Sequence, residues 1–566
     1  MNHSEIVSFL WGTADLIRDS FKRGKYQDVI LPLTVLRRID CVLAPKKAKV
    51  LERNAGLKGK LENLDPQLRK ASGFAFYNTS QYDFERLLAD PANIAANLRN
   101  YINGFSENMR EVIEKFDFDN TITKLESADL LYKVVERFKN VDLHPDRVDN
   151  PTMGTIFEEL IRKFNEALDE NPGEHFTPRD VVHLMVRLML AGDEKRIRGE
   201  GVIRTICDPC CGSGGMLSIA KDHILGSGDR EGVNPEADIH LFGQEVNPET
   251  YAICKSDLYM KSADGRDAEN IRFGTTLGKD LFRRKFDYQI ANPPYGKDWK
   301  RDEEAVKAEA ASPSGRFGAG LPRISDGQLL FLEHMLSHMK PVKEGGSRVA
   351  IIMNGSPLFT GDAGSGESEI RRWILENDWL EALVALPEQL FYNTGIATYV
   401  WVLSNRKAKE RRGKVQLVDA TSFWTPMRKS LGSKRREVPA EKAQDILKIL
   451  ADYRHDDMRV VAKNGKEVET IVSKIYPTTH FGFRKITVER PLKLDFQACP
   501  ERLAQLEEER AFKNLVVSKK KKVEQKRKEE EAGRAEQEAI RKLLAGLPGT
   551  LYRDRTDFVK LLKAAA

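Results

Sequence analysis

The sequence predicts an α/β protein, in which a doubly wound, Rossmann-like sheet lies between an N-terminal helical domain and a C-terminal helical arm. Three observations predict this fold class. Strand and helix patterns alternate over residues 151–425, as a parallel sheet covered by helices requires. A strand, a glycine-rich turn and a helix follow one another over 202–225, as in a nucleotide-binding βαβ unit. The highly charged stretch 501–541 is typical of an exposed helix. We therefore expect domains at 1–150, 151–425 and 426–566.

The first 150 residues are predicted to be mostly helical. Apolar residues begin an amphipathic face at Ile6, Leu10 and Ile17. We expect four to six helices in this domain, including helices over 29–43, 95–116 and 123–139. The proline-containing stretch 143–151 marks the boundary to the sheet domain.

The glycine-rich turn reads DPCCGSGG over residues 208–215. Glycine lets the backbone turn tightly and approach a ligand closely, because no Cβ intervenes. The turn lacks the GK[ST] of a phosphate-cradling P-loop. A second strand pattern over 239–245 ends in Glu245, whose carboxylate can accept both hydroxyls of a ribose, and Asp208 would face the same crevice. A ligand with a ribose but no pyrophosphate therefore fits better than NAD.

Asn292 to Tyr295, with the sequence NPPY, follow a short apolar run over 286–291 that predicts a buried strand. Two prolines end this strand and remove two backbone donors from its tip. The tip presents an amide side chain, a free carbonyl and an aromatic face. This set suits a planar group with an exocyclic amine, because the Asn292 and Pro293 oxygens accept its N–H bonds and Tyr295 stacks on its ring.

These motifs resemble the S-adenosylmethionine-binding core of amino-methyltransferases, and DPCCGSGG followed by NPPY is similar to the N6-adenine DNA methyltransferases. The segment 173–179 (GEHFTPR) resembles the cofactor-cradling segment of such enzymes. More narrowly, the chain resembles the modification subunit of type I restriction–modification systems. This resemblance runs from Leu10 through HFGFR at 480–484 to about residue 500.

The resemblance implies a site-specific DNA adenine-N6 methyltransferase that uses S-adenosylmethionine and acts on a base rotated out of the duplex. It implies an acid near Gly274 to Leu277, where this chain has Thr275 and Thr276, so that Asp280 is a candidate substitute. It also implies that 391–395 helps to line the base pocket. The implied catalytic residues are Asn292, Pro293, Pro294 and Tyr295. The implied cofactor-binding residues are Glu174, His175, Phe176, Thr177, Pro178, Asp208, Cys210, Gly212, Ser213, Gly214, Gly215, Glu245 and Asn292.

The partners implied by the resemblance are double-stranded DNA, a DNA-specificity subunit bound by two modification subunits, and a restriction subunit in the full complex. The charged C-terminal end would pack on the specificity subunit. The expected location is the cytoplasm of a bacterium or archaeon. The recognised DNA sequence would then be determined by another polypeptide.

Alternatives remain open at this level. NPPY also serves methyltransferases that act on RNA bases or on glutamine amides of proteins, because the chemistry is the same. A non-catalytic, cofactor-sensing DNA-binding subunit is a hypothesis from another class. Residues 296–325, rich in charge, Gly, Ala and Ser, are expected to be either a lid over the extruded base or a surface insertion.

Composition and charge limit the classes of protein to which the chain can belong. The net charge of +6 and pI of about 8.7 are compatible with nucleic-acid contact but too small to argue it. We expect no membrane span and no signal peptide, and six cysteines suggest a reducing compartment. Cys207 and Cys210 could form half a zinc site, and Pro209-Cys210 resembles a cytosine-methyltransferase nucleophile. Packing is the favoured role, and no metal is expected.

Overall fold

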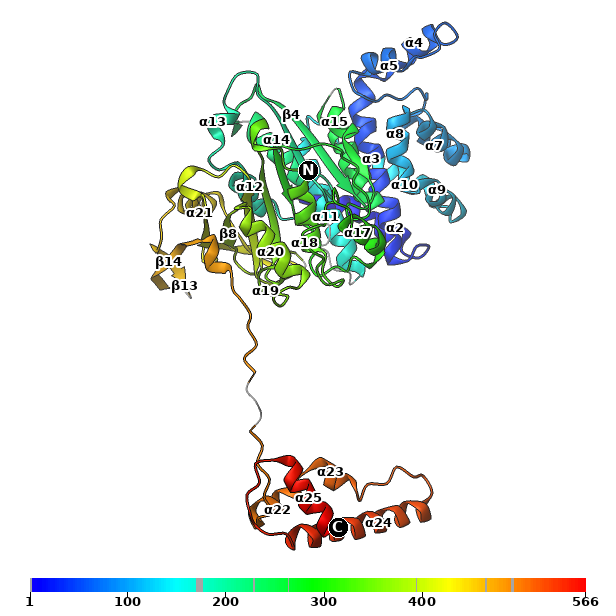
Figure 1. Ribbon diagram of the computed structural model, residues 1–566. Coiled ribbons are helices and arrows are strands. Elements are labelled where there is room, and N and C mark those ends of the chain that lie inside the picture. The colour runs from blue at the N-terminus through cyan, green and yellow to red at the C-terminus, as the bar shows by residue number, and fades with distance from the viewer. Residues whose placement is uncertain are drawn as a thin grey trace. The chain divides into compact units, whose positions relative to one another are not determined.

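The computed structural model describes residues 3–168, 177–227, 230–262, 264–392, 394–463, 466–489 and 493–566. The chain forms two compact units, Met1–Phe483 and Arg484–Ala566, which are described separately (Figure 1).

The first unit contains a ten-stranded sheet in the order β13-β14-β10-β8-β9-β7-β6-β1-β4-β5. Eight consecutive strands of this order, from β10 to β5, run parallel except for β9, which is antiparallel to both β7 and β8. The predicted Rossmann-like α/β fold is confirmed. The strands are β1 (Ile203–Asp208), β4 (Asp238–Glu245), β5 (Ile271–Phe273), β6 (Tyr288–Ala291), β7 (Arg348–Asn354), β8 (Leu380–Ala385), β9 (Thr398–Ser404), β10 (Lys414–Asp419), β13 (Asp457–Lys463) and β14 (Lys466–Pro477).

The order of the strands changes direction at β1. From β1 the chain proceeds to β4 and β5 on one side and then returns to β6 and β7 on the other. The carboxyl ends of β1, β4 and β6 therefore lie side by side at one edge. In open α/β sheets, a crevice forms at such a switch point, outside the carboxyl ends of the strands.

Helices cover both faces of the central part of the sheet, which explains why its central strands β6, β7 and β9 are almost completely buried. In β7, Val349 and Ile351 face a core that includes α18 and α20, whereas Ala350 and Ile352 face the core that contains α12. The helices of this region are α11 (Asn150–Leu168), α12 (Arg179–Leu190), α13 (Glu194–Ile197), α14 (Gly215–Leu225), α15 (Pro248–Lys261), α16 (Arg266–Glu269), α17 (Glu303–Ala310), α18 (Gln328–Ser337), α19 (Ser356–Phe359), α20 (Gly366–Glu376) and α21 (Ala440–Asp452).

The N-terminal region contains more helices than the sequence predicted. Among residues 3–139 there are ten, so the estimate of four to six is wrong. The expected helix 95–116 is broken because Phe105 pairs with Asn78 in a β-bridge, and 123–139 is interrupted at Asp129, which has a φ of 55°. The ten helices are α1 (His3–Trp11), α2 (Thr13–Ile17), α3 (Gln27–Leu43), α4 (Lys47–Leu57), α5 (Asp65–Ser72), α6 (Phe84–Leu88), α7 (Ile94–Asn103), α8 (Glu107–Glu114), α9 (Phe118–Ser127) and α10 (Leu131–Lys139).

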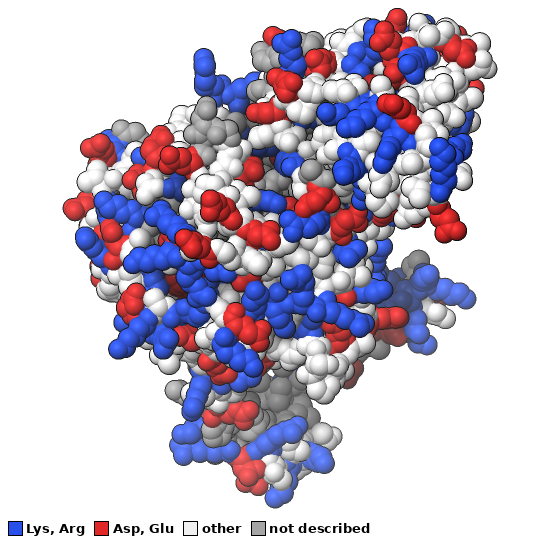
Figure 2. All heavy atoms as spheres, turned by 90° about the horizontal axis from the view of Figure 1, so that it is seen from above, with Lys and Arg blue, Asp and Glu red and all other residues white. Residues whose placement is uncertain are grey.

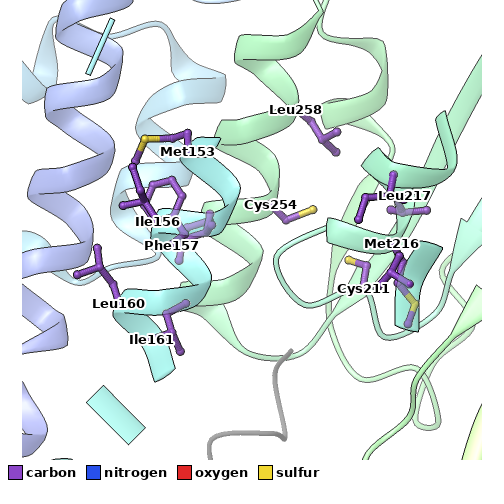
Figure 3. Close-up of a cluster of buried hydrophobic side chains, with 14 of the residues drawn as sticks. Met153, Ile156, Phe157, Leu160, Ile161, Cys211, Met216, Leu217, Cys254 and Leu258 are labelled. Carbon is purple, nitrogen blue, oxygen red and sulfur yellow. The ribbon is translucent and has the colours of Figure 1, made fainter. Parts of the chain in front are cut away.

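A continuous apolar core joins these helices to the sheet. Helix α11 lies between the two regions, and its Phe157 and Leu160 belong to the same buried cluster as α3, α12 and α15 (Figure 3). The N-terminal helices lie beside the sheet, with α3 and α8 in contact with α15 (Figure 1). The burial of this shared apolar surface holds the N-terminal region and the sheet in one compact unit.

Residues 296–325 are largely folded. The segment contains the short helix η5 (Lys300–Asp302) and α17, and its Trp299, Val306 and Phe317 are buried with Leu277 and Leu330 in a small separate core. The sequence carries no sign of this small core, because the segment is rich in charge and small residues and its three buried large apolar side chains have no helical or strand period.

The chain continues into the sheet beyond residue 425. After β10 it forms a two-stranded hairpin, β11 (Thr425–Leu431) and β12 (Lys434–Glu437), and then α21, β13 and β14. A second small hairpin joins β2 (Gly226–Ser227) and β3 (Arg230–Glu231). The three domain limits stay a prediction.

The second unit is helical. It contains α22 (Pro500–Leu506), α23 (Arg510–Asn514), α24 (Val523–Ala545) and α25 (Arg555–Ala565). Phe496 pairs with Tyr552 in a β-bridge, and its ring stacks on that of Phe558 at 5.6 Å. Among the described helices of both units, none has the length and apolar character to cross a bilayer.

Candidate active site

A cavity of about 550 Å³ opens at the carboxyl ends of β1, β4 and β6. Its size is in the range of about 300–1,000 Å³ that small-molecule sites occupy. The turn after β1, the end of β4 and the first residue after β6 supply one part of its wall. Further parts come from α11, from the starts of α12, α14, α15 and α18, from the segment 275–277 and from the folded insertion 296–325.

Asn292 is the first residue after β6, and its side chain has a fixed orientation. The Asn292 Nδ2 donates a hydrogen bond to Thr177 Oγ1 at 2.8 Å. The Asn292 Oδ1 is buried and has no hydrogen-bond partner among the described residues. A buried acceptor without a partner costs about 1–3 kcal/mol. This oxygen is therefore poised to accept a hydrogen bond from a ligand.

The aromatic side chain of the NPPY motif contacts a second aromatic ring. The rings of Tyr295 and Phe391 meet edge to face, with centroids 6.0 Å apart. The Tyr295 hydroxyl is also buried without a partner among the described residues, and burial raises its pKa, so it stays neutral. Of the four motif residues, Asn292 and Pro294 line the described cavity wall, and Pro293 and Tyr295 do not.

Glycines give the turn after β1 its shape. Gly212 and Gly214 have φ angles of 52° and 80°, which L side chains rarely adopt. A Cβ on Gly214 would lie 2.6 Å from Cys254 Sγ on α15. The sulfurs of Cys211 and Cys254 point toward each other in Figure 3. Among the described residues no acidic, Cys and His side chains are grouped as a metal site requires, and these cysteines pack against the turn.

Glu245 binds the turn through its own side chain. Its Oε2 accepts a hydrogen bond from the backbone N–H of Gly212 at 2.8 Å, and its Oε1 accepts from those of Val246 and Asn247. A carboxylate offers about four acceptor sites. These bonds leave one site for a ribose hydroxyl, rather than the two that the sequence suggested.

Asp208 is buried at the end of β1 and lines the cavity. Burial raises its pKa to about 7, the N–H of Cys210 opposes this rise, and the charge of Glu245 adds to it. An acid with such a pKa is near half-ionised at neutral pH, and a nearby cation would favour its charged form.

The wall on the α12 side carries an ion pair. Arg179 contacts Glu158 of α11 at 3.3 Å, and both residues line the cavity beside Thr177. Burial raises the pKa of Glu158, and the charge of Arg179 opposes this rise. Pro178 precedes α12 and is not part of the described wall. Glu174, His175 and Phe176 lie outside the described residues.

The insertion supplies an acid that the sequence did not identify. Thr275 Oγ1 donates to Asp302 Oδ2 at 2.6 Å, and both residues line the cavity. Asp280, the candidate substitute, is not part of the described wall and instead contacts His338 Nε2 at 3.2 Å. Neither Asp302 nor Glu158 stands in a recognisable motif. The only signal for Asp302 was the missing acid near Thr275.

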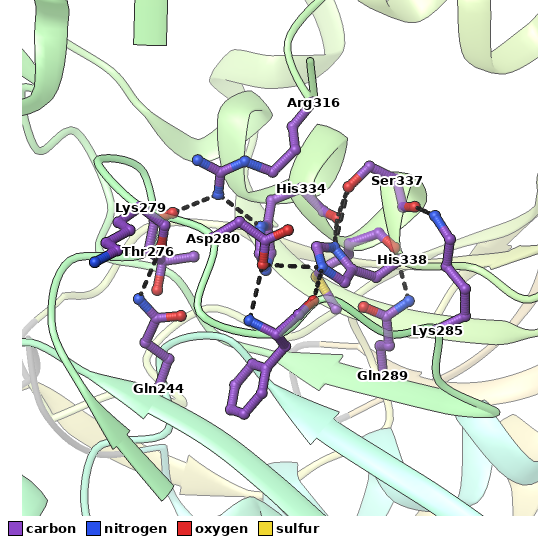
Figure 4. A network of polar contacts seen from close by, with 12 residues as sticks. Gln244, Thr276, Lys279, Asp280, Lys285, Gln289, Arg316, His334, Ser337 and His338 are labelled. Atoms are coloured by element: carbon purple, nitrogen blue, oxygen red, sulfur yellow. Dashed lines mark hydrogen bonds and ion pairs between the residues drawn. The ribbon is translucent and has the colours of Figure 1, made fainter. Parts of the chain in front are cut away.

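Arg316 of the insertion forms hydrogen bonds with residues of the cavity wall and so holds the insertion against it (Figure 4). Its guanidinium donates to the carbonyl oxygens of Thr276 at 2.6 Å and Leu277 at 3.0 Å, and it pairs with Glu309. A further N–H of Arg316 donates to His334 Nδ1 at 3.0 Å. Burial lowers the pKa of His334 well below its usual value, so the ring is neutral and can accept this bond.

The described lining of the cavity includes eight of the predicted cofactor residues: Thr177, Asp208, Cys210, Gly212, Ser213, Gly215, Glu245 and Asn292. Gly214 belongs to the same turn but not to the described lining, and its close contact with Cys254 shapes the turn. A cavity outside the carboxyl ends of the strands, at the switch point of the strand order, is where open α/β sheets bind their ligands, and this fold and site are those of a class of α/β enzymes.

Comparison with known proteins gives the family. The chain belongs to the N-6 DNA methylase family, whose model matches residues 148–476, and the HsdM N-terminal domain model matches residues 6–138. The resemblance predicted from the motifs is thereby confirmed.

Curated relatives agree with this assignment. The chain is 25% identical over 518 residues to the type I restriction enzyme MjaIX methylase subunit of Methanocaldococcus jannaschii, covering 88% of this chain and 83% of the relative. It is 26% identical over 304 residues to the HindI methylase subunit of Haemophilus influenzae, covering 54% and 60%.

A solved structure shares the fold. The type I restriction-modification system methyltransferase subunit from Streptococcus thermophilus superposes with a TM-score of 0.59 at 21% identity. The superposition covers 80% of this chain and 94% of that structure.

Proposed function

We propose that this chain transfers a methyl group from S-adenosylmethionine to N6 of an adenine rotated out of double-stranded DNA, as the modification subunit of a type I restriction–modification complex. The observation that carries this proposal is the unpartnered Oδ1 of Asn292, held in place by Thr177 beside the cavity. Membership of the N-6 DNA methylase family supports the reaction and the substrate.

The residues of the cavity fit S-adenosylmethionine. Glu245 has an acceptor site for one ribose hydroxyl, and the Arg179–Glu158 pair presents both charges to a zwitterionic amino-acid group. No GK[ST] phosphate cradle is present in the turn, in keeping with a ligand that lacks a pyrophosphate. When bound, S-adenosylmethionine supplies an electrophilic methyl group on a sulfonium.

The side chain of Asn292 orients the acceptor amine. Its Oδ1 and the carbonyl of Pro293 accept the two N6 hydrogens, which draws the nitrogen lone pair out of conjugation with the base. Extruding the base costs a few kcal/mol, and stacking on Tyr295 offsets part of that cost. No covalent nucleophile is needed, because alignment and electrostatics dominate such a transfer. The N6 proton leaves after transfer, when the nitrogen is cationic.

Asp302 takes the place of the acid expected near Thr275. Its Oδ2 already accepts from the Thr275 hydroxyl, and its carboxylate lines the cavity. A carboxylate in this position accepts a hydrogen bond from an exocyclic amine such as that of the cofactor adenine. The insertion thereby becomes part of the cofactor site.

The ionisation of Asp208 makes cofactor binding pH-dependent. Because S-adenosylmethionine carries a net positive charge, it favours the ionised carboxylate and lowers the pKa of Asp208 from about 7. Binding therefore releases a proton, and affinity rises with pH. For a pKa lowered by about one unit, to about 6 in the complex, we expect about fivefold tighter binding at pH 8 than at pH 6. Calorimetry at pH 6, 7 and 8 measures this.

Asp208→Asn is the matched variant, since it keeps the shape of the side chain and removes the titration. Its cofactor affinity should be nearly independent of pH. A wild-type affinity that is flat across this range would contradict the role given to Asp208.

The proposed partners are a DNA-specificity subunit shared by two copies of this chain and a restriction subunit in the complete assembly. The names of the relatives, which are subunits of type I restriction enzymes, support this proposal. The charged helical unit 484–566 is the proposed surface for the specificity subunit.

Tritiated methyl transfer tests the proposal. The chain is assayed with and without a co-expressed specificity subunit on duplex DNA, on RNA and on a glutamine-containing protein substrate, followed by nucleoside and amino-acid analysis. We expect label in N6-methyladenine of DNA. Label in RNA or in glutamine would assign one of the alternative substrates, and cofactor binding without any transfer would assign a sensing subunit.

A further inference from the structure

We propose that the β11–β12 hairpin, residues 425–437, binds the phosphate backbone of the substrate nucleic acid next to the active site. This inference rests on the proposed function and adds a substrate-binding element to it.

The hairpin carries a concentrated positive charge. Five of its thirteen residues are Lys or Arg and one is Glu. Arg428, Lys429 and Arg435 are exposed, and within the described parts of the chain no acidic side chain forms an ion pair with them. In contrast, acidic and basic side chains are interspersed over the face of the molecule seen in Figure 2. Cations without counter-charges release bound counterions when they contact phosphates, which favours binding.

One anchor of the hairpin is α12, which begins at the cavity wall. The buried Lys434 of β12 contacts both carboxylate oxygens of Asp180 at 3.0 Å, and the backbone N–H of Val438 donates to the same carboxylate at 2.9 Å. Asp180 directly follows Arg179, a wall residue. This anchor places β12, from Lys434 beside the turn of the hairpin to Val438 after its end, next to the α12 side of the active site.

The second anchor is the loop that carries Phe391. The backbone N–H of Ser433 donates to the carbonyl of Tyr392 at 2.8 Å, and that of Arg435 donates to the carbonyl of Gln389 at 3.0 Å. Phe391, between these two residues, contacts the ring of Tyr295. The tip of the hairpin is therefore tied to the aromatic pair of the NPPY side.

The fit at the second anchor is close. Gly432 has a φ of 59°, and a Cβ there would lie 2.4 Å from the Tyr392 carbonyl oxygen. The Arg436 guanidinium lies 4.0 Å from the centroid of the Trp424 ring. The hairpin is held by backbone hydrogen bonds and by the side chains of Lys434 and Arg436, and the exposed side chains of Arg428, Lys429 and Arg435 take no part in these contacts.

Both anchors join the hairpin to elements that reach the active site, α12 and the loop of Phe391, so the hairpin lies beside the site and its exposed cations can meet phosphates that flank the reacting base. Extrusion of a base exposes the flanking phosphates to the protein, and cations at this position would hold the strand during that step. The ligand that fits these cations is the phosphodiester backbone, bound independently of the base sequence.

The test removes three charges and measures binding of a fluorescent duplex by anisotropy at several salt concentrations. The variant is R428Q/K429Q/R435Q in the complex with the specificity subunit. If all three cations contact phosphates, the plot of the logarithm of the association constant against the logarithm of the salt concentration should become shallower by about 2.7 in slope. The affinity at 0.15 M salt should fall by about a hundredfold. Cofactor affinity should stay within about twofold.

The control variant is K195Q/R198Q/K343Q. These three exposed cations precede β1 and β7 at the amino-terminal edge of the sheet, opposite the site. It should bind the duplex as the wild type does.

The outcomes separate this inference from the function on which it rests. A wild-type complex without methyl transfer to DNA overturns the proposed function. An active wild type with an unchanged hairpin variant, or an equal loss in the control, overturns the hairpin alone. A hairpin variant that no longer assembles with the specificity subunit makes the hairpin a protein-docking element and also overturns the inference.

Discussion

Asn292→Ala is expected to lower the rate of methyl transfer by about a thousandfold or more, while cofactor affinity stays within about threefold. Removal of a single preorganised group at a reacting centre costs about 10²–10³ in rate. Here the variant also loses the alignment of the amine, because no other buried acceptor among the described residues stands at this position. Single-turnover transfer and calorimetry with S-adenosylmethionine measure the two quantities.

Thr177 supplies an independent check on the same geometry. Its hydroxyl accepts the Nδ2 hydrogen bond that orients Asn292. Thr177→Val should lower the rate about tenfold through misorientation of the amide, and Thr177→Ser should restore it. Asn377→Ala, which removes an exposed amide at the end of α20, is the matched control and should change neither the rate of methyl transfer nor the cofactor affinity. Undiminished N6-methyladenine formation by Asn292→Ala would refute the assigned role.

Arg316→Ala should lower the free energy of unfolding by about 2–4 kcal/mol, because each buried acceptor that loses its donor costs about 1–3 kcal/mol and the pair with the partly exposed Glu309 is lost as well. The substitution leaves the carbonyls of Thr276 and Leu277 and the ring of His334 without their donor. Since residues 276–277 line the cavity, cofactor affinity should fall as well. Urea denaturation measures the stability, and hydrogen exchange of peptides covering 276–278 and 299–317 locates the loss.

Lys307→Ala tests whether charge alone explains such a result. Lys307 lies in the same insertion and pairs with Glu303, but its side chain is 58% exposed, so its removal should cost less than about 0.5 kcal/mol. Exchange in the two peptides should not change. An Arg316→Ala protein with wild-type exchange in both segments would show that Arg316 does not hold the insertion to the wall.

Elements that bury continuous apolar runs were predicted closely from the sequence. The strand expected before Asn292 is β6, and the helix expected after the glycine-rich turn is α14, from Gly215 to Leu225. Such patterns are local, because a strand buried on both faces must be apolar throughout and a glycine-rich turn needs positive φ angles.

The N-terminal helices and the insertion were predicted less well because long-range contacts determine them. The break between α7 and α8 depends on the bridge of Phe105 to Asn78, and the folding of 296–325 depends on Arg316 and three scattered apolar side chains. Neither the bridge nor the contacts of the insertion produces a periodic pattern of apolar residues in the sequence. Tertiary contacts override local propensity in both places.

By itself, the sequence determined the groups that carry the chemistry: the amide of Asn292, the acid at the end of β4 and the glycines of the turn. Their roles follow from side-chain chemistry and backbone freedom, which are properties of a few adjacent residues. Only the tertiary structure decided how they are oriented and completed. Thr177 fixes the Asn292 amide from 115 positions away along the chain, and Asp302 reaches Thr275 from the insertion. The physical reason is that a hydrogen bond between distant segments depends on packing of the whole fold, which no local pattern records.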